Sequence, residues 1–324
     1  MKKKSLVFLM AVLLGALLLA ACSQKENSEA SDKGLVIGIN QFTEHPALDE
    51  VKRGFEEELQ GLDGLSIDYK NAQGDMTNAM TISEKFLTDD VDLIFAIATP
   101  SAQSSQQVTK DRPIIFSAVT DPVETGLVED FERPGANITG TSDESPIERQ
   151  LELFRILDPS IKKIGIIFNT GEINSQVQLE NAEKAGKKLG LEIESIGVSS
   201  INDIAQATDS LIKKVDGIYT LTDNMVASAI NVVADKANEK GLISIGAEEA
   251  HVRGGILMTD GLSYFELGRQ SARMAKEVLL EKRDISSFPC ERAENTSKVF
   301  NPETLKKLNL DINNPAFKDA EKIK

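Results

Sequence analysis

Short apolar runs alternate with amphipathic stretches along most of this chain, and this alternation constrains the fold more than any other feature. Residues 34–40 form a continuous apolar run that is typical of a buried strand. Residues 46–61 then place apolar side chains three to four residues apart, which predicts a helix with one buried face. The order continues with strands expected at 65–69, 91–97, 113–117 and 137–140 and a helix at 75–87.

The pattern begins again near residue 143. Strand–helix alternation on this period indicates βαβ units and parallel sheets, so the restart predicts an α/β protein with two such sheets. The tail from Lys282 contains three prolines and is expected to be irregular, with one short strand. In the second half, helices are expected at 146–157, 174–189, 201–214, 224–240 and 264–281, and strands at 163–168, 191–196, 217–221, 242–245 and 256–259.

The first 22 residues have the pattern of a secretory signal. Three lysines precede an apolar run at 6–20, which is shorter than the ~20 residues that a bilayer-spanning helix needs. Ala20-Ala21-Cys22 resembles the lipobox of bacterial lipoproteins, in which the chain is cut before the cysteine and the cysteine is lipid-modified. This predicts a signal peptide at 1–21, lipidation of Cys22 and a polar tether at 22–33. The alternatives are an ordinary signal peptide and an uncleaved anchor.

Composition excludes several functions. A formal net charge of −15 argues against binding a nucleic-acid backbone or adhering to anionic lipid. The two histidines, His45 and His251, are far apart in the sequence, and the chain contains one cysteine besides Cys22. No metal site and no cofactor are therefore expected. Nucleophile-elbow, phosphate-loop and dinucleotide motifs do not occur in the sequence.

Polar residues follow most of the predicted strands. In parallel sheets the ligand site lies outside the carboxyl ends of the strands, so these residues are candidates for binding. Serine, threonine, asparagine and aspartate are also the usual helix-capping residues, and at any single position capping alone explains them. The candidates are Thr99, Ser101, Thr120, Asp121, Asn169, Asn174, Ser175, Asp223, Asn224 and Glu248.

The chemistry of these residues suits a zwitterion such as an amino acid. Helix N-termini offer free N–H groups for a carboxylate, and Asp121, Asp223, Glu248 or Asp260 would hold an ammonium group. Phe42 is the one aromatic residue at a strand end in the first half. It would either stack on a flat ligand or pack as a hydrophobic staple against the following helix.

Two stretches carry a resemblance to a known family. Residues 116–123 (FSAVTDPV) and 134–140 (PGANITG) resemble the signature of solute-binding lipoproteins of ABC importers, in the tryptophan/tyrosine-type group. The resemblance implies a type I periplasmic-binding-protein fold, with two Rossmann-like lobes joined by three crossovers. The first lobe would comprise 34–142 plus 261–283, and the second 143–260 plus 284–324.

The resemblance also implies a function. The chain would be a monomeric, non-enzymatic protein on the outer face of the cell membrane. It would capture an amino acid, with tryptophan or another aromatic amino acid as the best guess, by closure of the lobes. It would then deliver the ligand to an ABC permease and its ATPase.

Roles in the site follow from the same reasoning. Backbone N–H groups near Thr99–Ser101 and Asn224 would bind the carboxylate, and Asp121 or Asp223 the ammonium. The alternatives are a sensor module of the same fold that serves a receptor kinase, and a secreted hydrolase. The scattered histidines disfavour the hydrolase, because they assemble no nucleophile–base pair.

Overall fold

A computed structural model describes residues 34–294 and 296–323 of the chain. The predicted signal peptide at 1–21, the lipidation of Cys22 and the tether at 22–33 lie outside the described residues. Within the described part, no helix combines the length and the apolar character that crossing a bilayer requires.

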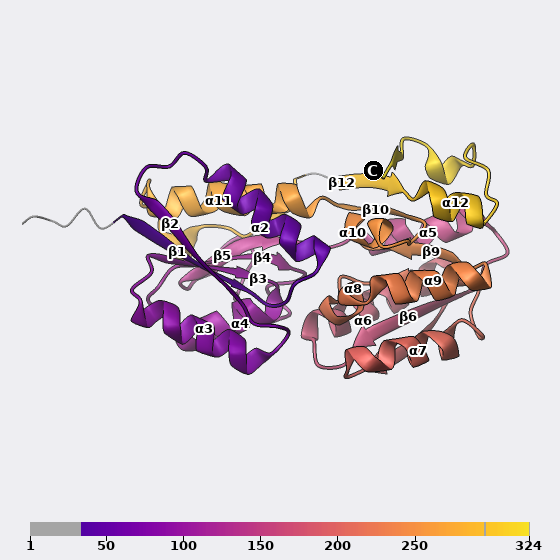
Figure 1. The fold of residues 1–324 in the computed structure, drawn as a ribbon, viewed down its shortest axis with the longest axis horizontal. Coiled ribbons are helices and arrows are strands. Elements are labelled where there is room, and N and C mark those ends of the chain that lie inside the picture. The colour runs from indigo at the N-terminus through magenta and orange to yellow at the C-terminus, as the bar shows by residue number, and fades with distance from the viewer. Residues whose placement is uncertain (1–33, 295, 324) are drawn as a thin grey trace, which may run out of the picture. The chain divides into compact units, whose positions relative to one another are not determined.

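The first sheet contains six strands in the order β11-β5-β4-β3-β1-β2, and all its pairings are parallel. The central strands are buried on both faces, which explains their continuous apolar sequences. Figure 1 shows α2 and α11 on one face and α3 and α4 on the other. The elements are β1 (Leu35–Gln41), α2 (Pro46–Glu58), β2 (Leu65–Asn71), α3 (Met76–Thr88), β3 (Leu93–Ile97), α4 (Thr99–Val108), β4 (Ile114–Val119), β5 (Ile138–Ser142), α11 (Tyr264–Leu279) and β11 (Glu291–Arg292).

Helices α2 and α11 approach each other through two glycines. A Cβ atom on Gly54 would lie 2.0 Å from the carbonyl oxygen of Phe265, and one on Gly268 would lie 2.0 Å from the carbonyl oxygen of Val51. Only glycine permits this approach of the two backbones. Beneath the helices, Phe55 stacks on Phe95 of β3 with the ring centroids 3.7 Å apart, so the helix pair is fixed against the sheet.

The second sheet contains seven strands in the order β13-β12-β10-β9-β8-β6-β7. Its pairings are parallel except that β12 runs antiparallel to β10. Helix α5 packs against α6, and α7 packs against α9. The elements are α5 (Ile147–Leu157), β6 (Lys163–Asn169), α6 (Ile173–Leu189), β7 (Glu192–Val198), α7 (Ile204–Leu211), β8 (Gly217–Thr220), α8 (Asn224–Ser228), α9 (Ile230–Lys240), β9 (Ile243–Gly246), α10 (Glu249–Arg253), β10 (Met258–Leu262), β12 (Thr296–Phe300), α12 (Pro302–Lys307) and β13 (Glu321–Lys322).

The predicted α/β fold with two mostly parallel sheets is confirmed. The chain passes between the sheets after β5, after β10 and between β11 and β12. The last passage differs from the predicted boundary at 283/284, because β11 pairs with β5 and Phe288 packs in the core of the first sheet. We call the part around the first sheet lobe 1 and the part around the second sheet lobe 2.

Two elements differ from the sequence prediction. The helix expected at 224–240 is interrupted at Ala229, whose φ of −118° and ψ of 21° are not helical, and so forms α8 and α9. The tail, expected to hold one short strand, contains β11, β12, α12 and β13. The short strands were missed because a pairing of two residues leaves no periodicity to recognise.

Candidate functional site

The carboxyl ends of the strands in the two sheets meet at a small cavity of about 10 Å³. A ligand pocket ordinarily measures roughly 300–1,000 Å³, so the lobes are closed too tightly here to admit a ligand of amino-acid size. The cavity is lined from both lobes by His45, Leu48, Ala118, Asp143, Asn174, Thr222, Asp223, Asn224, Ala227, Glu248 and Tyr264.

Two sets of polar contacts join the lobes across this cavity. Gln178 Nε2 on α6 donates a hydrogen bond to Thr120 Oγ1 after β4, at 3.3 Å. The same Gln178 accepts from the backbone N–H and the hydroxyl of Thr222. On the other side, His45 Nε2 lies 3.3 Å from Asn224 Oδ1. These contacts hold the closed lobes together through uncharged hydrogen bonds, and we call them the latch. Because they are weak, the lobes can open again.

A network of buried polar groups forms the lobe 2 wall. Asp223 caps α8 by accepting from the Val226 N–H, and its second oxygen accepts from the Asn169 N–H and from Ser175 Oγ. Glu172 accepts from the side-chain amides of three residues, Asn169, Asn174 and Asn224.

Both carboxyl groups of this wall hold their protons more tightly than usual. Burial raises the pKa of Asp223. Burial and the nearby Asp223 charge raise the pKa of Glu172 to about 7. All four oxygens of Asp223 and Glu172 are engaged within lobe 2, so the two residues hold the wall in shape.

A second pair of buried carboxyl groups faces the cavity from opposite lobes. Asp143 follows β5, and its Oδ2 accepts from the Tyr264 hydroxyl at 2.5 Å. Glu248 precedes α10, and its Oε1 lies 2.9 Å from His251 Nε2. Burial raises the pKa of Asp143 to about 6, and the Glu248 charge adds to the shift. Burial also lowers the pKa of His45, so this ring is uncharged at neutral pH.

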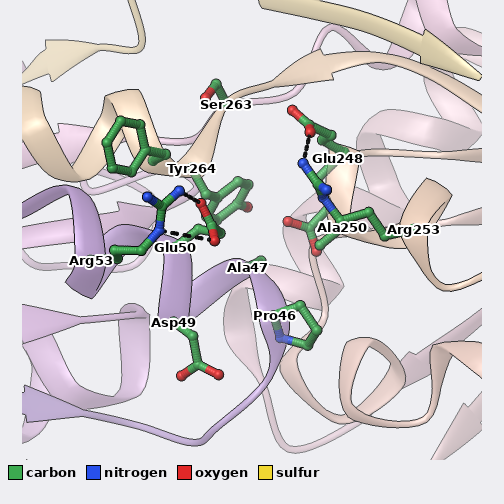
Figure 2. A pocket seen from close by; sticks show the side chains of 12 residues that line it. Pro46, Ala47, Asp49, Glu50, Arg53, Glu248, Ala250, Arg253, Ser263 and Tyr264 are labelled. Carbon is green, nitrogen blue, oxygen red and sulfur yellow. Dashed lines mark hydrogen bonds and ion pairs between the residues drawn. The ribbon is translucent and has the colours of Figure 1, made fainter. Parts of the chain in front are cut away.

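Two further hollows adjoin the cavity. A pocket of about 220 Å³ lies between the lobes beside Asn224, with Phe42 from lobe 1 and Ile201 and Met225 from lobe 2 in its wall. A groove of about 610 Å³ lies on the other side, and Glu248 and Tyr264 line both this groove and the cavity. Figure 2 shows this groove, with residues of α2 on one side and of α10 on the other.

Two alanines at the cleft have positive φ angles. Ala98, after β3, has φ 79° and ψ 154°, a region that is otherwise almost confined to glycine. Ala118, near the end of β4, has φ 56° and lines the cavity. Such strain costs about 1–3 kcal/mol per residue and is concentrated at functional sites. Both strained residues lie at the edge of the first sheet that faces lobe 2.

The structure brings most of the predicted site residues together. Asn169, Asn174, Ser175, Asp223 and Asn224 form the lobe 2 network. Thr120 lies at the contact between the lobes, Glu248 lies at the cavity, and Phe42 lines the adjoining pocket.

Three predicted residues lie elsewhere. Ser101 donates to Asn40 Oδ1 in the interior of lobe 1. Asp121 accepts from the N–H groups of Val123 and Glu124 in its own turn. Thr99 is buried at the start of α4 and is not part of the cavity wall.

Sequence reasoning did not select five residues that the structure places at or beside the cavity. Some of these residues carry a signal in the sequence and others do not. Asp143 and Tyr264 directly follow or begin predicted elements, and His45 precedes the proline that starts α2, so their positions were available as signals. Glu172 and Gln178 offered none, because the direction of a side chain just before or on α6 depends on how that helix packs. The five residues are His45, Asp143, Glu172, Gln178 and Tyr264.

Polar strand ends that converge on a cleft between two α/β lobes define a binding protein of the type I periplasmic class. The family profile described as ABC transporter substrate binding protein matches residues 36–324. The chain therefore belongs to the family of ABC transporter substrate-binding proteins. These proteins bind solutes outside the cytoplasm for an ABC permease and are not enzymes.

Two similar proteins are named for an aromatic amino acid. A tyrosine-binding protein of Clostridioides difficile is 41% identical over 95% of this chain and 93% of its own length. A Streptococcus pneumoniae ABC domain in complex with L-Trp is 32% identical, with a TM-score of 0.85 over 90% of this chain and 100% of its own.

A third relative reveals the conformational state. The ligand-free, open structure of a Clostridium difficile substrate-binding protein with adhesive properties is 38% identical, and it covers 90% of this chain and 99% of its own. Its TM-score is only 0.69. The more similar sequence thus has the less similar structure, which indicates that the lobes here are closed relative to that open form.

Proposed function

We propose that this protein captures an aromatic amino acid, tyrosine or tryptophan, by closing its two lobes, and delivers it to an ABC permease. The observation that carries the proposal is the cavity wall. Buried polar atoms of both lobes converge there, so a ligand held at this wall would contact both lobes, and neither lobe alone would supply the whole site. The two relatives named for L-Trp and tyrosine support an aromatic ligand.

The aromatic side chain has a suitable place in the adjoining pocket. Phe42, Ile201 and Met225 offer apolar surface there, and Asn224 lies in the walls of both the pocket and the cavity. A ligand whose polar end occupies the cavity would therefore direct its ring past Asn224 toward Phe42. Stacking on Phe42 is worth about 0.5–1.5 kcal/mol beyond the burial of the ring.

The ligand carboxylate is proposed to lie at the start of α4. The first hydrogen bond of this helix runs from the Ala102 N–H to the Ala98 carbonyl, so the N–H groups of Thr99 and Ser101 precede it. Helix N-termini bind anions through such groups and through the helix dipole. In this role Thr99 and Ser101 act through their backbone, and the Ser101 hydroxyl remains with Asn40.

Membrane attachment through Cys22 belongs to the same proposal. A lipid-modified cysteine at the end of the polar tether at 22–33 would hold the folded part near its permease. A Cys22→Ala variant would then be released as a soluble protein with unchanged ligand affinity. Retention of that variant at the membrane would contradict the anchor, and loss of its binding would contradict the separation of anchor and site.

Thermal shift with each of the twenty amino acids tests the ligand. A ligand at a hundred times its Kd stabilises the folded protein by about 2.7 kcal/mol, so L-tyrosine or L-tryptophan should raise Tm while glycine and L-aspartate should not. Native mass spectrometry of protein purified without refolding gives an independent reading of a retained ligand. Equal Tm values with all twenty amino acids would refute the proposal.

A further inference from the structure

Three buried oxygen atoms at the interlobe cavity have no hydrogen-bond partner. They are Asp143 Oδ1, Asn174 Oδ1 and Glu248 Oε2, and each residue is at most 3% exposed. All three residues line the cavity. A buried polar atom without a partner costs about 1–3 kcal/mol, so such atoms are rare in a native protein. Three acceptors in one cavity call for a hydrogen-bond donor, which a bound ligand would supply.

Each of these side chains is held in place by its other atoms. Asp143 is held by the Tyr264 hydroxyl, and Glu248 is held by His251, whose Nδ1 lies 2.9 Å from Thr220 Oγ1. Asn174 donates from Nδ2 to Glu172 Oε2 at 3.2 Å, and this bond fixes which atom is its oxygen. The three free oxygens are therefore set in position before a ligand arrives.

The other carboxyl groups nearby are already engaged. Asp223 and Glu172 use both of their oxygens within lobe 2. Asp121 turns to the N–H groups of its own turn. Among the described residues that line the cavity there is no lysine or arginine, and the basic contact of the pair is His251 Nε2, which lies 2.9 Å from Glu248 Oε1.

We propose that Asp143, Asn174 and Glu248 form a subsite for the primary ammonium group of the ligand. An ammonium group has three N–H donors and a positive charge, which matches three free acceptors and two carboxylates. The two carboxylates come from opposite lobes, so the ammonium group joins the lobes when it binds. This inference rests on the proposed function, and it replaces Asp121 and Asp223 as the expected partners of the ligand amine.

Ligand analogues and isosteric variants separate the charge of the subsite from its shape. Isothermal titration calorimetry would compare L-tyrosine with 3-(4-hydroxyphenyl)propanoate, which lacks only the amine. Asp143→Asn and Glu248→Gln remove one charge each. Asp92→Asn is the matched control, because Asp92 lies at the amino end of β3, away from the carboxyl ends that face the cavity, and accepts from the Val36 N–H.

The wild-type protein should bind L-tyrosine at least a hundredfold more tightly than the propanoate. Each of the two variants should lose on the order of a hundredfold in affinity for L-tyrosine, because each leaves part of a buried charge interaction unpaired. Their affinity for the propanoate should equal or exceed that of the wild type. The control should match the wild type with both compounds.

Different failures identify different errors. If the wild type binds L-tyrosine and both variants bind it within threefold, the ammonium subsite is wrong and the proposed function stands. Equal wild-type affinity for L-tyrosine and the propanoate also overturns the subsite, and this measurement needs no variant that folds. If the wild type binds none of the twenty amino acids, the proposed function falls and the subsite with it.

Discussion

An Asp143→Asn substitution is expected to favour closure of the empty cleft while it weakens amino-acid binding. Burial raises the pKa of Asp143 to about 6 in the closed arrangement, from an ordinary 3.8. At 1.36 kcal/mol per pKa unit, the ionised carboxylate opposes closure by at most about 3 kcal/mol at pH 7, the full value applying if the open cleft restores the ordinary pKa. Asparagine keeps an oxygen for the Tyr264 hydroxyl but carries no charge. The empty variant should therefore be closed more often, by at most about a hundredfold.

The pH dependence of closure has a definite sign. Opening the cleft would separate Asp143 from the Glu248 charge and admit water, and both changes lower the pKa of Asp143, so the closed form binds more protons. Acid therefore favours closure, and this preference is present in full below about pH 4 and is lost as the pH rises through about 6. The titratable groups that share the cavity with Asp143 are His45, Asp223, Glu248 and Tyr264. The variant should lack the Asp143 part of the dependence.

Small-angle X-ray scattering of the ligand-free protein between pH 4 and pH 8 measures this directly. The radius of gyration of the wild type should fall as the pH is lowered, whereas that of Asp143→Asn should be small throughout. Asp92→Asn should behave like the wild type. The reasoning is refuted if the empty variant is as expanded as the wild type at pH 7, or if the variant binds L-tyrosine with wild-type affinity.

Three further predictions concern the latch, the strain and the helix contact. Gln178→Leu removes the contacts to Thr120 and Thr222, so ligand release from this variant should be about tenfold faster in stopped-flow fluorescence. A slower association rate of the variant would argue that Gln178 is not a latch. Ala98→Gly should raise the free energy of unfolding by about 1 kcal/mol by relieving the positive φ, and a lower value in urea titration would show that no strain is stored. Gly268→Ala should lower that free energy by about 1–3 kcal/mol through the clash with Val51, and an unchanged value would mean that α2 and α11 can separate freely.

The sequence was sufficient for the architecture because the governing signals are local. Alternating strands and helices show where a βαβ unit begins and ends, and the rule on carboxyl ends then places the polar residues at one edge. The passage after β11 was misplaced for the opposite reason. Glu291 and Arg292 pair with β5 across some 150 residues of sequence, and two residues carry no pattern that predicts such a pairing.

Which carboxylate faces the ligand amine was harder to predict from the sequence, although the sequence contains part of the information. Asp121 precedes a proline, and aspartate in that position commonly accepts from the N–H groups of its own turn. Asp223 stands three residues before Val226, the spacing of a helix cap. Asp143 follows β5 in the same way as Asp121 follows β4, but Tyr264 takes one of its oxygens and leaves the other free. That difference depends on a residue 121 positions away, so it emerges only from the folded structure.

The proposed ammonium subsite explains why closure would report the presence of ligand. The contacts between the lobes are long, uncharged hydrogen bonds of 3.3–3.4 Å, and they contribute little. Two buried carboxylates, Asp143 and Glu248, oppose closure, because closure brings them together with no lysine or arginine among the described residues of the cavity wall. A ligand shifts an equilibrium only through its differential affinity for the two states. An ammonium group between Asp143 and Glu248 has that differential affinity, because it touches both lobes only when they are closed. A permease that recognises the closed form would thus receive loaded protein and seldom an empty one.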